Sequence, residues 1–254
     1  MCNQPERLGA ALAPLGLRVP APVTRWAMAW VHAGEVLLAR TPRPSDAALE
    51  LGPTLAEPRS DCVLLTARQD DGDRDDLPPC RFRRWMLSED PTHTVDAAAW
   101  PAVVSHVPEF LRRNLRGRTT AELTLHTLIA LLHDQGRADD ANLRVGDLAR
   151  VLTEATGLVA AGLARAGQPS PTGVIAVSNS RALVLAGRDQ PLAIHALRVD
   201  NERGQRDESF RGVLVTAGVP APRDPDGPVP ELAPAGSLVT ITRDLHVAIG
   251  PLRA

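Results

Sequence analysis

The stretch Thr119-Thr120-Ala121-Glu122-Leu123-Thr124-Leu125-His126-Thr127-Leu128-Ile129-Ala130-Leu131-Leu132 predicts the first of two long helices in the middle of the chain. Thr119 and Glu122 have the spacing of a capping box, in which the hydroxyl and the carboxylate each accept a backbone N–H at the start of a helix. Leucines recur behind it at helical spacing until Gly136 supplies a stop. Apolar residues recur at helical spacing again over residues 147–166, which predicts the second long helix. We expect these two helices to lie together in one layer.

Strands are predicted on both sides of the helices. Before them, residues 26–31 and 35–40 have the spacing of a hairpin, and 61–67 and 81–87 are further apolar runs, with short helices near 45–55 and 108–115. After them come six more predicted strands, at 173–178, 181–186, 192–199, 211–217, 237–242 and 245–249. The order of strands, helices and strands favours an α+β layered fold over a doubly wound sheet, which would alternate the two. We expect a single domain over residues 2–254.

Composition excludes several function classes. The 254 residues carry a net charge of −2, which argues against a nucleic-acid or anionic-membrane binder. No apolar run is long enough to span a membrane and the start lacks a leader pattern, so we expect a soluble cytoplasmic protein. All 28 basic residues are Arg, and Tyr is absent. A Schiff-base lysine, a P-loop lysine and a tyrosine acid are therefore excluded.

The acidic run 70–76 and the segment 224–228 are predicted to be surface loops. The run has several carboxylates and a glycine, but its spacing does not match a calcium-binding EF-hand. The seven histidines lack metal-ligand spacing as well, His126 and His133 on one helix face included. No metal and no cofactor is expected.

Three cysteines, at positions 2, 62 and 80, are too few and too scattered for a disulfide framework or a zinc site. Cys62 and Cys80 are expected in the interior. Cys2 would become the terminal residue if Met1 were removed, and its own α-amine could then act as general base toward its thiol. The alternative is that a cysteine at this position has no function.

In its order of elements the chain resembles the class II glutamine amidotransferases, which begin Met-Cys and have the N-terminal-nucleophile hydrolase fold. The short form of that family, similar to the ergothioneine-biosynthesis amidohydrolase, has Leu-Gly at the offset of Leu8-Gly9. Further segments similar to family motifs occur in the same order along the chain, at 26–40, 64–68, 82–87, 117–123, 213–217 and 229–238. The resemblance spans most of the sequence and implies a four-layer αββα sandwich.

The resemblance also implies site residues, and here the chain departs from the family. Arg68 matches the arginine that holds the substrate carboxylate, whereas Thr120 stands where an aspartate holds the substrate amine. Glu89 and Asp90 replace the Asn-Gly pair of the oxyanion hole, and carboxylates cannot donate to an oxyanion. The family segment expected between Gly9 and Trp26 is largely deleted. From the residues alone, Arg68 could equally lie on the surface beside the acidic run, and positions 89 and 90 could form a solvated turn or bind a cation or an amine.

Two functions remain as hypotheses. In the first, the Cys2 thiolate attacks a glutamine or γ-glutamyl amide, its α-amine moves the proton, and Arg68 orients the small-molecule substrate. In the second, the chain is a catalytically inactive homologue that keeps the sandwich as a binding or partner-scaffolding module.

Overall fold

The computed structural model describes residues 1–41, 47–69, 76–201, 203–219 and 229–252. The predicted acidic loop, apart from Asp76, the loop at 224–228 and the first residues of the expected helix at 45–55 lie outside these ranges. Within the described residues, no helix is both long and apolar enough to cross a membrane.

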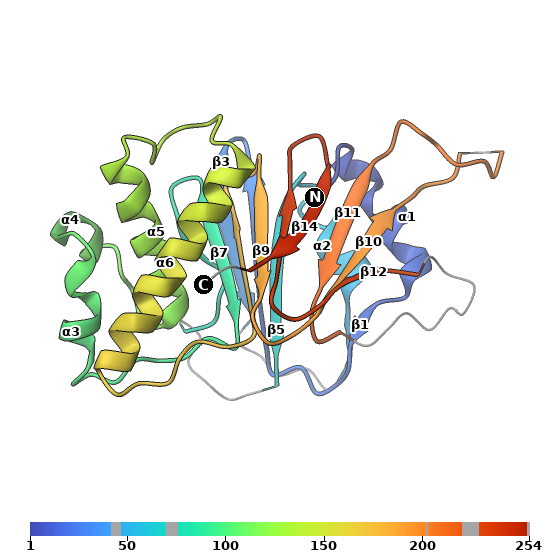
Figure 1. Ribbon diagram of the computed structural model, residues 1–254. Coiled ribbons are helices and arrows are strands. Elements are labelled where there is room, and N and C mark those ends of the chain that lie inside the picture. The colour runs from blue at the N-terminus through green and yellow to red at the C-terminus, as the bar shows by residue number, and fades with distance from the viewer. Residues whose placement is uncertain (42–46, 70–75, 202, 220–228, 253–254) are drawn as a thin grey trace.

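Four layers stack from one side of the molecule to the other (Figure 1). Helices α5 and α6 cover one face of a six-stranded sheet, whose other face packs against a second layer of strands. Helices α1 (Leu8–Leu12) and α2 (Leu51–Ala56) cover the outer side of that second layer. The expected αββα sandwich is therefore confirmed, and its inter-sheet space is where a site can form.

The six-stranded sheet has the order β14-β13-β9-β8-β7-β6 and is antiparallel throughout. Its strands are β6 (Cys80–Phe82), β7 (Trp85–Asp90), β8 (Val174–Ser178), β9 (Leu183–Gly187), β13 (Ser237–Ile241) and β14 (Val247–Pro251). Residues that alternate along β7 contact opposite layers, because Trp85 and Leu87 face the helices whereas Met86 faces the second layer of strands.

The second layer consists of two three-stranded sheets, β3-β2-β5 and β11-β10-β12. Their strands are β2 (Arg25–His32), β3 (Glu35–Thr41), β5 (Val63–Arg68), β10 (Leu192–Leu197), β11 (Gly212–Thr216) and β12 (Glu231–Ala233). The short strands β1 (Arg18–Val19) and β4 (Leu49–Glu50) form a separate pair. The edge strands β5 and β11 belong to different sheets, and the N-terminal segment of the chain lies between them.

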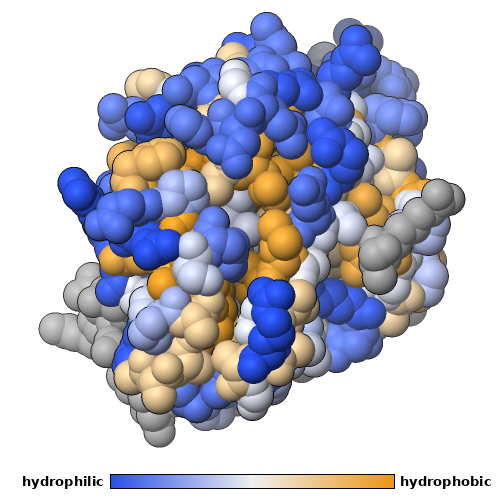
Figure 2. All heavy atoms as spheres, turned by 60° about the vertical axis from the view of Figure 1, so that its left-hand side comes forward, coloured by the Kyte–Doolittle hydropathy of each residue, from blue (hydrophilic) through white to orange (hydrophobic). Residues whose placement is uncertain are grey.

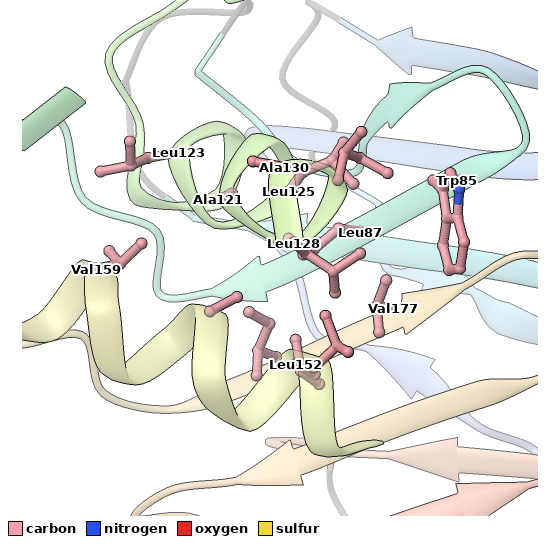
Figure 3. Packing of buried hydrophobic residues seen from close by; sticks show 14 of the residues in the cluster. Trp85, Leu87, Ala121, Leu123, Leu125, Leu128, Ala130, Leu152, Val159 and Val177 are labelled. Atoms are coloured by element: carbon pink, nitrogen blue, oxygen red, sulfur yellow. The ribbon is translucent and has the colours of Figure 1, made fainter. Parts of the chain in front are cut away.

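The helical layer is built on α5 (Thr120–Asp134) and α6 (Val145–Arg165), with α3 (Trp100–Val103) and α4 (Glu109–Arg112) beside them. Short 3₁₀ turns lie at Pro5–Arg7, Ala13–Leu15 and Val104–His106. Leucines of α5 and α6 pack on Trp85, Leu87 and Val177 of the sheet (Figure 3). The two predicted long helices do form one layer.

The N-terminal cap of α5 differs in one detail from the predicted capping box. The Thr119 hydroxyl accepts the Glu122 N–H at 3.2 Å, as expected. The Glu122 carboxylate instead accepts the N–H groups of Arg116 and Gly117, both at 2.8 Å. It therefore anchors the preceding loop to the helix.

Two expectations about residues 81–90 are wrong. The run 81–87 is not one strand but a hairpin, in which β6 and β7 join through Arg83 and Arg84, with Arg83 at φ 52°. Glu89 and Asp90 are not a solvated turn, because they are the last two residues of β7 and Glu89 is fully buried. The hairpin shifts the strand toward Pro91 and carries both carboxylates into the sheet.

The helical side of the molecule, brought forward in Figure 2, is hydrophilic over most of its area, with hydrophobic groups in smaller patches between. This distribution is ordinary for a protein surface.

Candidate functional site

The N-terminal residues bridge the facing edges of β5 and β11. The Cys2 N–H donates to the Asp61 carbonyl just before β5, at 2.9 Å. On the other side, the Val213 N–H donates to the Met1 carbonyl and the Met1 amino group donates to the Val213 carbonyl, both at 2.8 Å. Residues 1–3 thus form an extended segment between the two sheets, with an isolated antiparallel bridge between Cys2 and Gly212.

Beyond Met1 the space between these edges is a cavity of about 250 Å³. Its side walls are β5 (residues 63–67) and residues 213–219 of β11 and the turn after it. Its floor is the inner face of the six-stranded sheet, with Ala176 and Leu185, and Leu51 and Leu55 of α2 cover it from outside. The wall is largely apolar, with Met1 at one end.

The other end of the cavity is polar. The hydroxyls of Thr66 on β5 and Ser88 on β7 hydrogen-bond to each other across the two layers. The Arg68 guanidinium, at the end of β5, forms an ion pair with Asp90 at 2.8 Å. Thr66, Ser88 and Asp90 all line the cavity, so this end offers hydroxyl and carboxylate groups to a ligand.

Cys2 does not point into that polar end. It is buried in an apolar cluster with Leu8, Leu12 and Phe210, and its Sγ lies 3.9 Å from the Ser60 carbonyl oxygen. Burial raises the pKa of the Cys2 thiol, although the nearby amino terminus acts in the opposite direction. The thiolate, which is the nucleophilic form, is therefore disfavoured at neutral pH.

Cys2 and Arg68 lie at opposite ends of β5. The Cys2 backbone N–H bonds to the Asp61 carbonyl just before the strand, and Arg68 ends the strand seven residues after Asp61. At about 3.3 Å per residue, the two positions are on the order of 20 Å apart. A small amide substrate held by Arg68 could not also reach the Cys2 thiol.

Thr120 and Glu89 occupy the opposite face of the six-stranded sheet. The Thr120 hydroxyl donates to the Glu89 carboxylate, which also forms an ion pair with Arg188 at 2.8 Å. The Thr120 N–H donates to the His93 carbonyl. The five residues implied by the resemblance therefore fall into three places: Cys2 alone, Arg68 with Asp90, and Thr120 with Glu89.

Thr66, Ser88 and Arg188 were missed by the sequence analysis. Thr66 and Ser88 each stand two residues before Arg68 and Asp90, so strand alternation places each pair on one face. The predicted strand at 81–87 ended before Ser88 and Asp90, so this pairing became visible only with the observed bounds of β7. No signal in the sequence indicated the pairing of Glu89 with Arg188, because the two residues are 99 positions apart.

The other two cysteines are buried, as expected. Cys62 Sγ contacts the Ser178 hydroxyl at 3.3 Å, and burial raises the pKa of both thiols, that of Cys80 well above its ordinary value. Among the residues that the structure describes, no group of three or more His, Cys, Asp or Glu side chains could hold a metal ion.

Solved structures of glutamine amidotransferase-type proteins are similar to this chain in backbone. A "glutamine aminotransferase class-II domain protein" from Silicibacter pomeroyi superposes with a TM-score of 0.53 at 16% identity, over 93% of this chain and 98% of that one. The chain has the class II glutamine amidotransferase fold. A predicted glutamine amidotransferase from Pseudomonas aeruginosa matches at 14% identity and a TM-score of 0.50, over 88% and 86% of the two chains.

The same amidotransferase fold forms part of a larger neighbour. The glutamine phosphoribosylpyrophosphate amidotransferase of B. subtilis matches 98% of this chain but only 47% of its own, at 8% identity and a TM-score of 0.51. No protein-family model matches the sequence, and no curated protein is significantly similar to it. The likeness is therefore one of backbone, and the residues of the site have to be judged on their own geometry.

Proposed function

We propose that this chain is a binding module with the amidotransferase fold, which holds a ligand in the inter-sheet cavity and does not hydrolyse glutamine. One observation carries the proposal: Cys2 lies at the opposite end of β5 from Arg68, with its sulfur in an apolar cluster. Nucleophilic catalysis needs the attacking atom about 3 Å from the reacting carbon. A separation on the order of 20 Å removes that possibility for a substrate anchored at Arg68.

The carboxylates support the same proposal. Asp90 is engaged by Arg68, and Glu89 by Arg188 and Thr120. In this arrangement Arg68 has its charge matched within the protein, and Thr120 and Glu89 hold α5 on the sheet. These residues then stabilise the fold, while the apolar walls and the two hydroxyls of the cavity remain for a ligand.

A second candidate is an amidohydrolase that uses Cys2 after removal of Met1. Met1 lines both the main cavity and a smaller cavity of about 30 Å³ that contains Cys2. Loss of Met1 would join the two spaces and leave an α-amine beside the Cys2 thiol. Such an enzyme would take a glutamine or γ-glutamyl amide whose carboxylate is not held by Arg68.

One experiment separates the two candidates. The purified protein is weighed intact, to establish whether Met1 is present, and is then incubated with a diazoketone analogue of glutamine and, separately, with glutamine and γ-glutamyl amides. We expect no covalent adduct, and ammonia release equal to that of the Cys2→Ala variant.

An adduct mapped to Cys2, together with ammonia release that Cys2→Ala abolishes, would establish the hydrolase and overturn the binding proposal. Cys62→Ala is the matched control, because Cys62 is buried like Cys2 but does not become the terminal residue when Met1 is removed. Labelling that persists in Cys2→Ala and disappears in Cys62→Ala would mark a reaction unrelated to the proposed nucleophile.

A further inference from the structure

The inter-sheet cavity is bounded by two strand edges whose backbone groups face each other. The pairing of the β2–β3 hairpin determines which backbone groups of β5 bond to β2 and which point into the cavity. His32 and Glu35 flank its two-residue turn and are therefore a hydrogen-bonded pair, so by alternation Ala29 directs its backbone groups to Leu64 of β5. The next residues of β5 must then direct their N–H and C=O groups the other way, into the cavity: Val63, Leu65 and Ala67.

On β11 the same alternation starts from an observed pair. Met1 and Val213 exchange two backbone hydrogen bonds across the gap. Val215 therefore also directs its N–H and C=O groups into the cavity, whereas Leu214 faces β10. Within the described ranges, none of the cavity-facing groups beyond Met1 has a backbone partner across the gap.

The two edges are one strand apart. The Met1–Asn3 segment bonds to Asp61 on one side and to Val213 on the other, so the gap at this point is filled by a single extended chain. It pairs antiparallel with β11 at Cys2 and Gly212. Because backbone groups in an apolar space need partners, the ligand best suited to the rest of the gap is another extended backbone.

We propose that the cavity is a strand-binding site for the C-terminal end of a polypeptide. The ligand is a segment of four residues with small apolar side chains, antiparallel to both β5 and β11, opposite positions 217 to 214. This proposal rests on the binding function proposed above and names its ligand class. The apolar floor at Ala176 and Leu185 and the cover at Leu51 and Leu55 select apolar side chains on both faces of the bound strand.

The direction of the bound strand determines which end of the ligand lies next to Met1. A chain antiparallel to both edges runs toward Met1, so its last residue lies opposite Leu214 and its carboxylate meets the amino group at that end of the cavity. Among the residues that the structure describes, the Met1 ammonium bonds to one carbonyl, that of Val213, and removal of Met1 would leave the ammonium of Cys2 at the same end. An ammonium beside a carboxylate is favourable in either form.

The test uses the full chain and synthetic peptides. The probe is acetyl-Val-Ala-Val-Ala with a free carboxylate, and the readout is amide hydrogen exchange at Leu65 and Val215, with Leu64 as internal control because it is already paired with β2. We expect exchange at Leu65 and Val215 to slow by about tenfold or more at saturating peptide, since each gains a hydrogen-bonded partner. Exchange at Leu64 should not change.

Two matched peptides test the geometry. Acetyl-Val-Ala-Pro-Ala lacks the N–H that would pair with the Val215 carbonyl, and we expect it to bind about tenfold more weakly. The C-terminal amide of the first peptide should bind roughly fivefold more weakly, because it lacks the charge that meets the ammonium. Val215→Pro removes the corresponding N–H from the protein edge and should weaken binding while β10 pairing is retained.

Absence of protection by the first peptide, or equal binding of the proline peptide, would overturn the strand site. Equal binding of the amide would overturn the choice of a C-terminal end. These outcomes are independent of hydrolysis: ammonia release at Cys2 would overturn the proposed function even where peptide protection is observed, and an inactive protein without protection would overturn only the ligand assignment.

Discussion

At the scale of single residues, adjacent positions on β7 have separate roles because a strand directs neighbouring side chains to opposite faces. Asp90 faces the second layer of strands and pairs with Arg68, whereas Glu89 faces the helices and pairs with Arg188 and Thr120. Glu89 is fully buried, and its charge is balanced within the protein. A family motif at these two positions cannot be transferred as a pair once the strand separates them.

We predict that Glu89→Ala destabilises the protein by about 3 kcal/mol, because it leaves Arg188 without its buried partner. Urea unfolding measures the change. The matched control is Asp139→Ala, which removes the partner of Arg83 in an exposed pair and should cost less than about 1 kcal/mol. Similar losses in the two variants would contradict the assigned role of Glu89.

At the scale of elements, β5 and β7 are held together across the two layers at the polar end of the cavity. The Thr66 and Ser88 hydroxyls bond to each other there, and Thr66 is buried. Their contact could not be predicted from the sequence, because it depends on how two separate sheets pack against each other. Hairpins within one sheet, such as β2–β3, need no such packing and were predicted from spacing alone.

We predict that Thr66→Val and Ser88→Ala each destabilise the protein by about 1 kcal/mol, because each leaves the other hydroxyl without its partner. The double variant should cost clearly less than the sum of the two, since no hydroxyl is then left unpaired. A double-mutant cycle from urea unfolding gives the coupling. Additive losses would mean that the two hydroxyls do not depend on each other.

At the scale of the whole molecule, the three thiols occupy three different apolar clusters. Cys80 lies between the helices and the six-stranded sheet, Cys62 lies between the two layers of strands, and Cys2 lies under α1 and α2. Burial raises the pKa of all three. The folded protein therefore holds three protons more tightly than the unfolded chain does.

We predict that stability falls at alkaline pH. The stabilisation from protonated thiols is fully present below their ordinary pKa of about 9.0 and is lost as the pH rises through the raised values. The free energy of unfolding should fall with a slope of up to about 1.4 kcal/mol per pH unit for each thiol. The chain has no Lys and no Tyr, so the thiols dominate this range.

Urea unfolding between pH 8 and pH 11 measures the effect. Cys80→Ala serves as the control, since it removes a thiol whose pKa is raised well above its ordinary value and should flatten the pH dependence while lowering stability at every pH. A free energy of unfolding that stays constant over this range would contradict the burial of the thiols.

The sequence by itself determined the layer order, the two long helices, the first hairpin, the buried cysteines and the resemblance to the amidotransferase fold. The helices, the hairpin and the buried cysteines follow from local patterns, because apolar periodicity, capping residues and short turns act between residues that are near each other in the chain. The layer order was implied by the resemblance, which rests on motifs that occur in the same order along the chain. The hairpin at β6–β7 was missed because its turn consists of two arginines rather than glycine or asparagine.

Only the tertiary structure decided the site. Whether Cys2, Arg68 and Thr120 meet depends on which strand edges face each other and on which side of a sheet each residue lies, and those relations join residues far apart in sequence. The structure places Cys2 at one end of β5 and Arg68 at the other, and it leaves an open gap between β5 and β11. Collinear motifs preserve the order of residues, but packing sets the distances on which chemistry depends.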